Sequence, residues 1–460
     1  MPAHVLSHLP TLQATVPCEI LSNPQSTKFQ EHLARWTDID LKTPAAIILP
    51  TSEEECVKIV QWALHYNIPF VTKSGGHSAW STIDESGIVI DLSAYKGVEV
   101  DTESQTATLI GGILSKEVGI ALAEKGLFTA LGNGNTVGSI PYFLGGGSSL
   151  TNSITGFGAD NIISAKLITA AGDLVVVNEE EHPDLLYALR GAGQFFGLVT
   201  QLTIQAYPTT LLRHQQGLIW VGSFIFDLEQ AFPVATAMQK IMDDPTHPTA
   251  GLMMVMAPPP SRSPCLVISA RYTGSEDPSV PFAALYALQP TLVTGGDVPI
   301  QNASDARAAL GVKGGFKAFG VVGLHSFNVD AFVQTVEVWK EMVETCPDAL
   351  NSAFNFQWDS RPPRGFEREG ACSLGGVRYW QNNLIWHTDS ANREKIDTYN
   401  ERCINIVREA DTGELVDFVN GTRTGPIERR FRGVERLETL RRVKREWDAR
   451  GVFTRELLDD

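Results

Sequence analysis

Glycine pairs that follow apolar runs place the strongest constraint on how this chain folds. Lys73-Ser74-Gly75-Gly76-His77-Ser78 follows the run Ile68-Pro69-Phe70-Val71, and Leu144-Gly145-Gly146-Gly147 repeats the pattern. Glycine adopts positive φ without a Cβ penalty and lets a backbone approach a flat or phosphorylated ligand closely. Successive N–H groups in such turns form a concavity that binds anions. His77 is therefore expected to lie against a bound ligand, where a neutral imidazole is a nucleophile.

The length and the charge of the chain narrow its class. One hydrophobic core stops growing beyond about 250–300 residues, so a chain of 460 residues is expected to form two domains. A net charge of −16 argues against a nucleic-acid partner, because that binding relies on neutralising phosphates. The chain has no run near the roughly 18 apolar residues that cross a bilayer, and its first residues lack a secretory signal pattern. We therefore expect a cytoplasmic protein without a membrane or nucleic-acid partner.

The spacing of the cysteines does not predict a metal site. No two of them form a Cys-x-x-Cys pair, and none has the Cys/His spacing of a zinc site. We expect isolated, mostly buried thiols in a reducing compartment. The residues are Cys18, Cys56, Cys265, Cys346, Cys372 and Cys403.

The first part of the chain, to about residue 210, alternates strand and helix signals. Ser52 and Glu55 form a capping-box pattern, and an apolar stripe at helical spacing follows it. A second helix starts at Pro183 and is ended by Gly191 and Gly193. Strands are predicted at 45–49, 69–71, 88–90, 106–110, 163–169, 174–177 and 198–204.

The remainder of the chain has longer strand-like runs and two long helices. A strand is predicted at 266–272, a helix from Asp330 and a tail helix around 437–447. The segment 451–453 is expected to pack back onto the first part of the chain. The glycine-rich segments contain neither the GK[ST] of a P-loop nor the GxGxxG of a dinucleotide fold, which argues against nucleotide hydrolysis.

Several glycine-containing segments occur in an informative order. They are 75–78, 89–93, 137–138, 144–147, 158–161, 188–193 and 196–200. This series resembles the FAD-binding domain of the vanillyl-alcohol oxidase superfamily, and within it the berberine bridge enzyme-like branch, especially its fungal members. The resemblance is tight over about residues 43–208 and returns weakly at 431–433, 436–437 and 451–453.

The resemblance implies an α+β fold with two domains. A PCMH-type FAD-binding domain is expected over 1–210 plus 416–460, and a substrate domain, an antiparallel sheet backed by helices, over 211–415. It also implies FAD joined through the His77 ring to the flavin 8α-methyl group. The FAD-binding residues it implies are Lys73, Ser74, Gly75, Gly76, His77, Ser78, Thr136, Val137, Gly138, Gly146, Asp160, Asn161 and Val199.

Three positions bear on the cofactor chemistry that the resemblance implies. Gly134 stands where many members of the branch carry a cysteine that forms a second flavin bond, so a single link through His77 is predicted. Lys73 replaces the usual arginine and keeps its charge without the planar fork. Val137 falls at the position that controls oxygen access, where valine resembles oxidases that use O2 as the electron acceptor. The alternative for Val137 is simple core packing.

The substrate side is predicted from the segment 373–387, which aligns with a strand that faces the flavin in the family. Alternate residues of a strand share a face, so Tyr379, Gln381 and Asn383 form one set and Trp380, Asn382 and Leu384 the other. Either set can line a pocket; the first is predicted to be catalytic, with Tyr379 as the base or hydrogen-bonding acid. The stretch 417–420 resembles a family segment ending in Tyr-x-Asn, with phenylalanine in place of tyrosine.

The expected activity is that of a FAD-dependent oxidase acting on a small molecule. Hydride passes from a substrate C–H to the flavin, which dioxygen reoxidises, in a tailoring step of specialised metabolism. One alternative keeps the fold but catalyses a non-redox isomerisation or cyclisation. A second is a flavin-holding binding protein without turnover.

Overall fold

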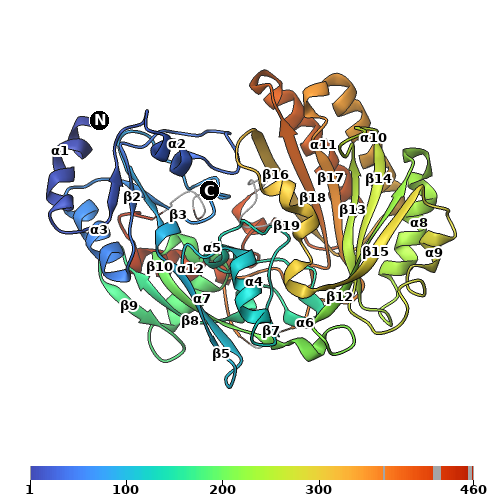
Figure 1. Cartoon of the computed structure of the whole chain (residues 1–460), viewed down its shortest axis with the longest axis horizontal. Helices are drawn as coiled ribbons and strands as arrows, with labels where there is room; N and C mark the ends of the chain where they lie inside the picture. The colour runs from blue at the N-terminus through green and yellow to red at the C-terminus, as the bar shows by residue number, and fades with distance from the viewer. Residues whose placement is uncertain (1, 366–367, 418–425, 454–457, 459–460) are drawn as a thin grey trace.

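The computed structural model describes residues 2–365, 368–417, 426–453 and 458, and the structural statements below concern these residues. Two lobes lie side by side (Figure 1). The first lobe holds the strands up to residue 208 and the second holds an eight-stranded sheet. The helices are α1 Pro2–Gln13, α2 Thr27–Leu33, α3 Glu53–His65, α4 Ser115–Ala123, α5 Ser139–Leu144, α6 Asn152–Thr155, α7 Pro183–Ala192, α8 Ala231–Met242, α9 Ala283–Tyr286, α10 Val329–Thr345, α11 Arg393–Ala410 and α12 Val434–Trp447.

The strands of the first lobe form two larger sheets and a short pair. They are β1 Glu19–Leu21, β2 Ala46–Leu49, β3 Phe70–Lys73, β4 Ile88–Asp91, β5 Lys96–Asp101, β6 Thr106–Gly111, β7 Leu127–Phe128, β8 Ile162–Ile168, β9 Leu174–Val177, β10 Leu198–Gln205 and β11 Tyr207–Pro208. The first sheet has the order β1-β2-β4-β3, in which β2, β4 and β3 run parallel. The second has the antiparallel order β5-β6-β10-β8-β9.

The helix that follows β2 begins where the sequence predicts. The Ser52 hydroxyl accepts the Glu55 N–H at 3.2 Å, which satisfies one of the donors left free at a helix start. The reciprocal half of the expected capping box is different, because the Glu55 carboxylate accepts from the backbone N–H and hydroxyl of Thr51 instead. The helix α3 thereby fixes the crossover from β2 to β3, whose end carries the glycine turn.

The C-terminal tail returns to the first lobe, as predicted. Leu437, Leu440 and Val443 of α12 share one apolar core with Leu185 of α7. Farther along, the ring of Phe453 packs edge-on against Phe70 of β3 with 5.6 Å between ring centroids. The first lobe is therefore completed by residues from both ends of the chain.

The second lobe is built on one large antiparallel sheet. Its strands are β12 Leu218–Phe226, β13 Thr249–Met256, β14 Cys265–Tyr272, β15 Leu292–Pro299, β16 Phe316–Leu324, β17 Ala353–Asp359, β18 Tyr379–His387 and β19 Val416–Asp417. In the part of the chain that the structure describes, their order is β15-β12-β14-β13-β17-β18-β16-β19. The helices α8, α10 and α11 pack over one face of this sheet (Figure 1). The opposite face is turned toward the first lobe and is available to a ligand.

Two boundaries differ slightly from the sequence prediction. The helix α10 begins at Val329 rather than Asp330, because the Asn328 side chain caps it by accepting the Ala331 N–H at 2.9 Å. The strand β19 pairs with β16, so residues 416–417 belong to the sheet of the second lobe and not to the first.

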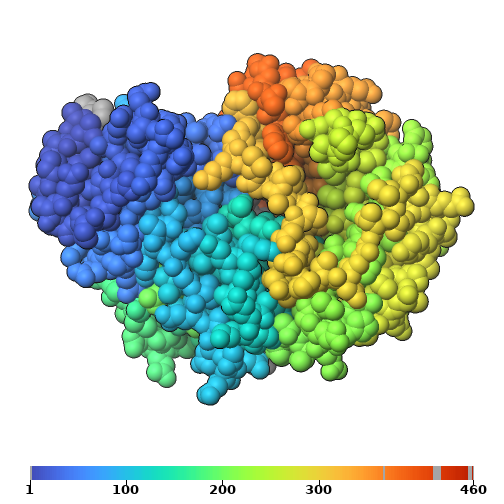
Figure 2. Space-filling model, in the orientation of Figure 1, coloured from blue at the N-terminus to red at the C-terminus, as the bar shows by residue number. Residues whose placement is uncertain are grey.

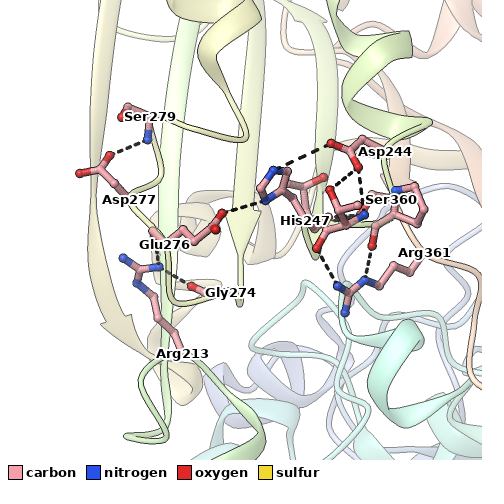
Figure 3. A network of polar contacts seen from close by, with 12 residues as sticks. Arg213, Asp244, His247, Gly274, Glu276, Asp277, Ser279, Ser360 and Arg361 are labelled. Carbon is pink, nitrogen blue, oxygen red and sulfur yellow. Dashed lines mark hydrogen bonds and ion pairs between the residues drawn. The ribbon is translucent and has the colours of Figure 1, made fainter.

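A polar network fixes the loops at one end of the large sheet. Arg213, in the segment that joins the lobes, donates to the Asp297 carboxylate at 2.7 Å and to the Glu276 carbonyl at 2.8 Å. The Glu276 carboxylate lies 3.2 Å from Nδ1 of His247, and the Ser360 hydroxyl donates to the His247 carbonyl at 2.7 Å (Figure 3). The network anchors the joining segment and therefore helps to set the position of the sheet.

Among the described residues, every helix is too short or too polar to cross a bilayer.

Candidate active site

A cavity of about 450 Å³ lies between the glycine-rich loops of the first lobe and the open face of the large sheet. Its first-lobe wall contains the turn 73–78, the loop 132–138 and the segment 197–199. Its second-lobe wall contains residues of β13, β16, β17 and β18 and of the segment 307–311. A ligand in this cavity would contact both lobes.

The turn that carries His77 is pressed against the loop 132–138. A Cβ atom on Gly75 would lie 2.2 Å from the Thr136 carbonyl oxygen and 2.8 Å from the Gly138 nitrogen, so no other residue fits there without a shift. Gly76 has φ of +72°, a conformation that favours glycine. The two loops are therefore in direct backbone contact at the cavity wall.

The His77 imidazole is held by one hydrogen bond and one stacking contact. Its Nε2 lies 2.9 Å from the Thr136 hydroxyl, and its ring stacks on Trp36 with 5.6 Å between centroids. Burial, followed by the charges of Lys317 and Lys313, lowers the pKa of His77 to about 4. The imidazole is consequently neutral at physiological pH, with an unprotonated nitrogen lone pair.

The lysine of the turn is held by a buried carboxylate. Lys73 Nζ lies 2.6 Å from the Asp91 carboxylate, and their side chains are 4% and 0% exposed. His32 Nδ1 contacts the same carboxylate oxygen at 2.9 Å. Burial raises the pKa of Asp91, but contacts with His32 and Lys73 outweigh it and bring the pKa to about 2. The ion pair of Lys73 and Asp91 therefore joins the end of β3 to the end of β4. A single charged nitrogen is sufficient for this contact, which explains how lysine can replace the usual arginine.

A segment of the second lobe forms part of the same wall. The short helix η7, Asp305–Gly311, is fastened to the first lobe by Lys116, whose Nζ lies 2.7 Å from the Asp305 carboxylate. Asn135 also donates to this carboxylate at 2.8 Å, and Arg307 donates to Asn133 at 2.9 Å. Figure 2 shows this yellow-orange segment lying against the cyan part of the first lobe. We call residues 305–311 the strap.

The structure corrects the predicted catalytic set. Tyr379, Gln381 and Asn383 point to the helix-covered face of the sheet, not into the cavity. Gln381 Nε2 donates to Asn383 Oδ1 at 2.7 Å, and Asn383 donates to Asn400 of α11 at 2.9 Å. Tyr379 is 2% exposed, and burial raises its pKa to about 12, which is the wrong direction for a base. The alternate residues Trp380 and Asn382 line the cavity instead.

The predicted cofactor residues divide into two groups. The first group lines the cavity and consists of Lys73, Ser74, Gly75, Gly76, His77, Ser78, Thr136, Val137, Gly138 and Val199.

Gly146, Asp160 and Asn161 lie behind that wall, which corrects their assignment. The Gly146 carbonyl accepts the Ala159 N–H at 2.8 Å. The buried Asn161 side chain donates to the Phe157 carbonyl at 2.7 Å and accepts from the Tyr207 hydroxyl at 2.7 Å. The Asp160 carboxylate accepts the Phe157 N–H at 2.9 Å, and burial raises its pKa to about 6. These residues satisfy the polar groups of a buried turn. The sequence motif that contains them therefore indicates this turn and not a direct contact with the cavity.

The remaining predicted positions lie elsewhere. Asp417 belongs to β19, whereas Phe418, Val419 and Asn420 of the predicted segment lie outside the described residues. The strap and Trp36 were missed from the sequence. Their contacts join residues that are far apart along the chain; for example, Trp36 Nε1 donates to the Leu310 carbonyl at 2.8 Å. No local sequence pattern predicts such contacts.

The sequence is similar to known proteins that bind FAD. Residues 44–178 match the family of the FAD binding domain. The FAD-linked oxidoreductase hasG of Aspergillus fumigatus is 30% identical over 451 residues, which cover 91% of this chain and 92% of that protein. The chain belongs to the FAD-linked oxidoreductase family. The family and the FAD-dependent oxidoreductase activity predicted from the glycine segments are thereby confirmed.

Two solved structures show the fold of this FAD-linked oxidoreductase. Physcomitrella patens BBE-like 1 has a TM-score of 0.82 and 18% identity, with 97% of each chain covered. The glucooligosaccharide oxidase from Acremonium strictum has a TM-score of 0.79 and 18% identity, with 98% of each chain covered; it is described with a 6-S-cysteinyl, 8α-N1-histidyl FAD. The predicted two-domain α+β fold class is confirmed.

The residues present in the cavity fit FAD. The Ser74 and Tyr142 hydroxyls line the cavity and, within the described residues, have no hydrogen-bond partner although they are buried. Buried polar atoms normally form a hydrogen bond, so these two hydroxyls are available to bind a polar ligand. The closely packed glycines Gly75 and Gly138 leave no side chain between the backbone and that ligand. FAD supplies both the polar groups and the flat ring system for such a cradle.

Proposed function

We propose that this FAD-dependent oxidoreductase is an oxidase whose flavin is bonded to His77. The single observation that carries the proposal is the neutral His77 imidazole, held at the cavity wall by Thr136 and Trp36. FAD supplies the acceptor of a substrate hydride. The chain holds that group against the sheet wall, and preorganisation of this kind is what a protein adds to cofactor chemistry.

The geometry of His77 favours Nδ1 as the bonding atom. Its Nε2 lies 2.9 Å from the Thr136 hydroxyl. When the ring proton is on Nε2, it is donated to this hydroxyl, and the free lone pair is then on Nδ1. With FAD bound, a bond from Nδ1 to the 8α carbon would replace one hydrogen of the methyl group and the Nε2–H of the imidazole, which would leave as two electrons and two protons. Dioxygen would accept them and become hydrogen peroxide. Gly134 offers no thiolate, so we propose one link rather than two.

The cofactor-side contacts follow from the cavity wall. We propose that the backbone of the turn 74–78 and of Gly138 holds the pyrophosphate, and that Val199 lies toward the ribityl-adenosine part. The proposed flavin domain comprises 1–210 and the chain after Asp417, with the substrate domain between them. This division differs from the sequence prediction by the two residues of β19.

Anaerobic spectroscopy tests the proposed oxidase activity. The purified protein is mixed with candidate small molecules without oxygen, and a substrate is expected to bleach the flavin absorbance. Aeration should restore the colour and release hydrogen peroxide. Product formation with unbleached flavin would favour an isomerase or cyclase, and tight binding with neither product nor bleaching would favour a binding protein.

The Thr136 hydroxyl is expected to control how fast the flavin is attached. Thr136→Val keeps the size of the side chain but removes the partner of His77 Nε2, so the imidazole loses its fixed orientation. A lost hydrogen bond of about 1–3 kcal/mol corresponds to roughly five- to a hundredfold slower attachment. Acid-stable flavin absorbance is followed over time after apoprotein is supplied with FAD. Thr246→Val, in an exposed turn, is the control; equal rates in all three proteins would remove the role of Thr136.

Val137 is expected to keep a path open for dioxygen. Its side chain lines the cavity and lies tightly over Gly134, where an added Cβ would be 2.8 Å from Val137 Cγ2. A leucine at this position must therefore extend into the cavity. For Val137→Leu we expect flavin reoxidation to slow about tenfold, equivalent to about 1.4 kcal/mol on the barrier, with little change in reduction. Stopped-flow absorbance measures both steps, and an unchanged reoxidation rate would assign Val137 to packing alone.

A further inference from the structure

Two side-chain amides lie next to each other on the sheet wall of the cavity. Asn355 of β17 is directly opposite Asn382 of β18 in the antiparallel register, and both line the cavity. Side chains that face each other in such a pair are about 4.5–5.5 Å apart at Cβ. The two amides therefore form one polar surface, which we call the amide pair.

The amide pair has hydrogen-bonding capacity that the described protein does not use. The Oδ1 atoms of Asn355 and Asn382 are buried and have no partner among the described residues, and Asn355 is only 8% exposed. The neighbouring carboxamide of Gln357 differs, because its Nε2 donates to the Ser148 hydroxyl at 3.2 Å. An unsatisfied buried acceptor costs stability. Two together on a cavity wall indicate a ligand that donates a hydrogen bond to them.

The surroundings of the amide pair are flat and aromatic. Trp380 lies on the same wall, and across the cavity edge the Trp36 ring stacks on Phe319 with 4.8 Å between centroids and 5° between planes. Val321, opposite Asn382 in the register, adds an apolar side chain. Such a wall favours a planar ring over a chain of polar groups, because aromatic rings bury large apolar areas in offset stacks.

The charges that line the cavity are already engaged. Lys73 is paired with Asp91, and Arg307 donates to Asn133 at 2.9 Å and to Ser269 at 2.7 Å. His77 is neutral because burial lowers its pKa to about 4. Among the described lining residues there is no aspartate or glutamate. A cationic substrate would thus find no counter-ion on this wall, and an anionic one would have to compete for a guanidinium that is already bonded.

We propose that the amide pair recognises the hydroxyl group of an uncharged, planar aromatic substrate. The hydroxyl donates to Oδ1 of Asn355 or Asn382, and the amide N–H groups donate to a second oxygen of the substrate. This inference rests on the proposed function in that the flavin occupies the first-lobe side of the cavity. Neutral amides bind but do not take up a proton, so the pair acts in specificity and not as a general base.

Matched naphthalene probes test the inference. The probes are 2-naphthol, its methyl ether, 2-naphthoate and 2-naphthylmethylamine, which differ only in the polar group. Binding is read from quenching of tryptophan fluorescence, since Trp36 and Trp380 line the cavity, and from perturbation of the flavin absorbance. We expect the naphthol to bind roughly tenfold or more tightly than each of the other three probes, as expected for a hydrogen bond to a buried acceptor.

Variants of the amide pair complete the experiment. Asn355→Leu combined with Asn382→Leu keeps the approximate volume, and the preference for the naphthol over its ether should fall to about twofold or less. Asn351→Leu, which alters a carboxamide bonded to Arg262 outside the cavity lining, should leave the preference unchanged. Should the double variant fail to fold, the single change Asn382→Asp replaces it and should increase the affinity for 2-naphthylmethylamine severalfold.

Each outcome of the test is decisive. Tightest binding of the carboxylate or the amine, or a naphthol preference that persists in the double variant, would overturn the inference; so would an Asn382→Asp protein without any gain for the amine. Fluorescence reports binding whether or not the flavin is bonded to the chain. A protein that binds the naphthol as expected but carries no acid-stable flavin would contradict the proposed covalent link and leave the amide pair in place.

Discussion

His77→Ala is expected to abolish acid-stable flavin completely. In the wild-type protein, acid precipitation should leave the yellow colour in the pellet, because a bond from the imidazole to the flavin survives unfolding. Alanine has no nucleophile, so all FAD should appear in the supernatant, and intact mass should match the polypeptide alone. The turn 74–78 and Gly138 still line the cavity in this variant, so the noncovalent contacts proposed for them should allow it to bind FAD reversibly.

The control for this experiment is another histidine. His65 lies exposed at the end of α3, and His65→Ala should retain the colour in the pellet. Covalent flavin that persists in His77→Ala would mean that a different side chain forms the bond. A wild-type pellet without colour would contradict the link itself while leaving membership of the FAD-linked oxidoreductase family untouched.

Asp91→Leu is expected to destabilise the first lobe by about 3–5 kcal/mol, because it leaves a buried cation without its partner. Lys73 is 4% exposed and 2.6 Å from the Asp91 carboxylate, so water cannot replace that carboxylate. The change also removes the acceptor of the Ser93 N–H at 3.0 Å, which starts the turn after β4. Denaturant unfolding followed by fluorescence measures the loss of free energy.

The pH dependence of stability provides a second readout for Asp91. Its pKa is lowered from 3.8 to about 2 in the folded protein, so the pair stabilises fully above pH 4. This stabilisation falls as the pH drops from about 4 to 2, and the slope should be shallower in Asp91→Leu. The double variant Lys73→Met with Asp91→Leu removes both charges and should recover most of the lost stability. A double variant no more stable than Asp91→Leu would argue that the two charges are not coupled.

The sequence predicts much of the first-lobe wall of the cavity because glycine requirements are local. Gly75 must lack a side chain because an added Cβ atom would lie 2.2 Å from the Thr136 carbonyl oxygen. The same reasoning predicts cofactor contacts for Asp160 and Asn161, but their side chains bond to the backbone of a buried turn behind the wall. A glycine-containing turn that is buried and one that contacts a ligand have the same pattern in sequence, and only the packing distinguishes them.

The substrate wall could be predicted only up to a choice between two faces. The alternation in β18 correctly separates Tyr379 from Trp380, yet both residues are buried and both faces carry polar side chains. What decides the matter is the position of α11, which covers the face of Asn383 through Asn400. That contact depends on the tertiary arrangement of two elements and leaves no periodic trace in the strand itself.

The return of α12 to the first lobe has a consequence for the order of events during synthesis. Leu437, Leu440 and Val443 complete a core begun by residues such as Leu185, more than two hundred positions earlier. Before α12 has been synthesised, the first lobe has an incomplete apolar core, and we expect the cofactor to be captured only after α12 has packed onto it. Truncations that remove α12 should therefore yield colourless protein even though every glycine of the cavity wall is present.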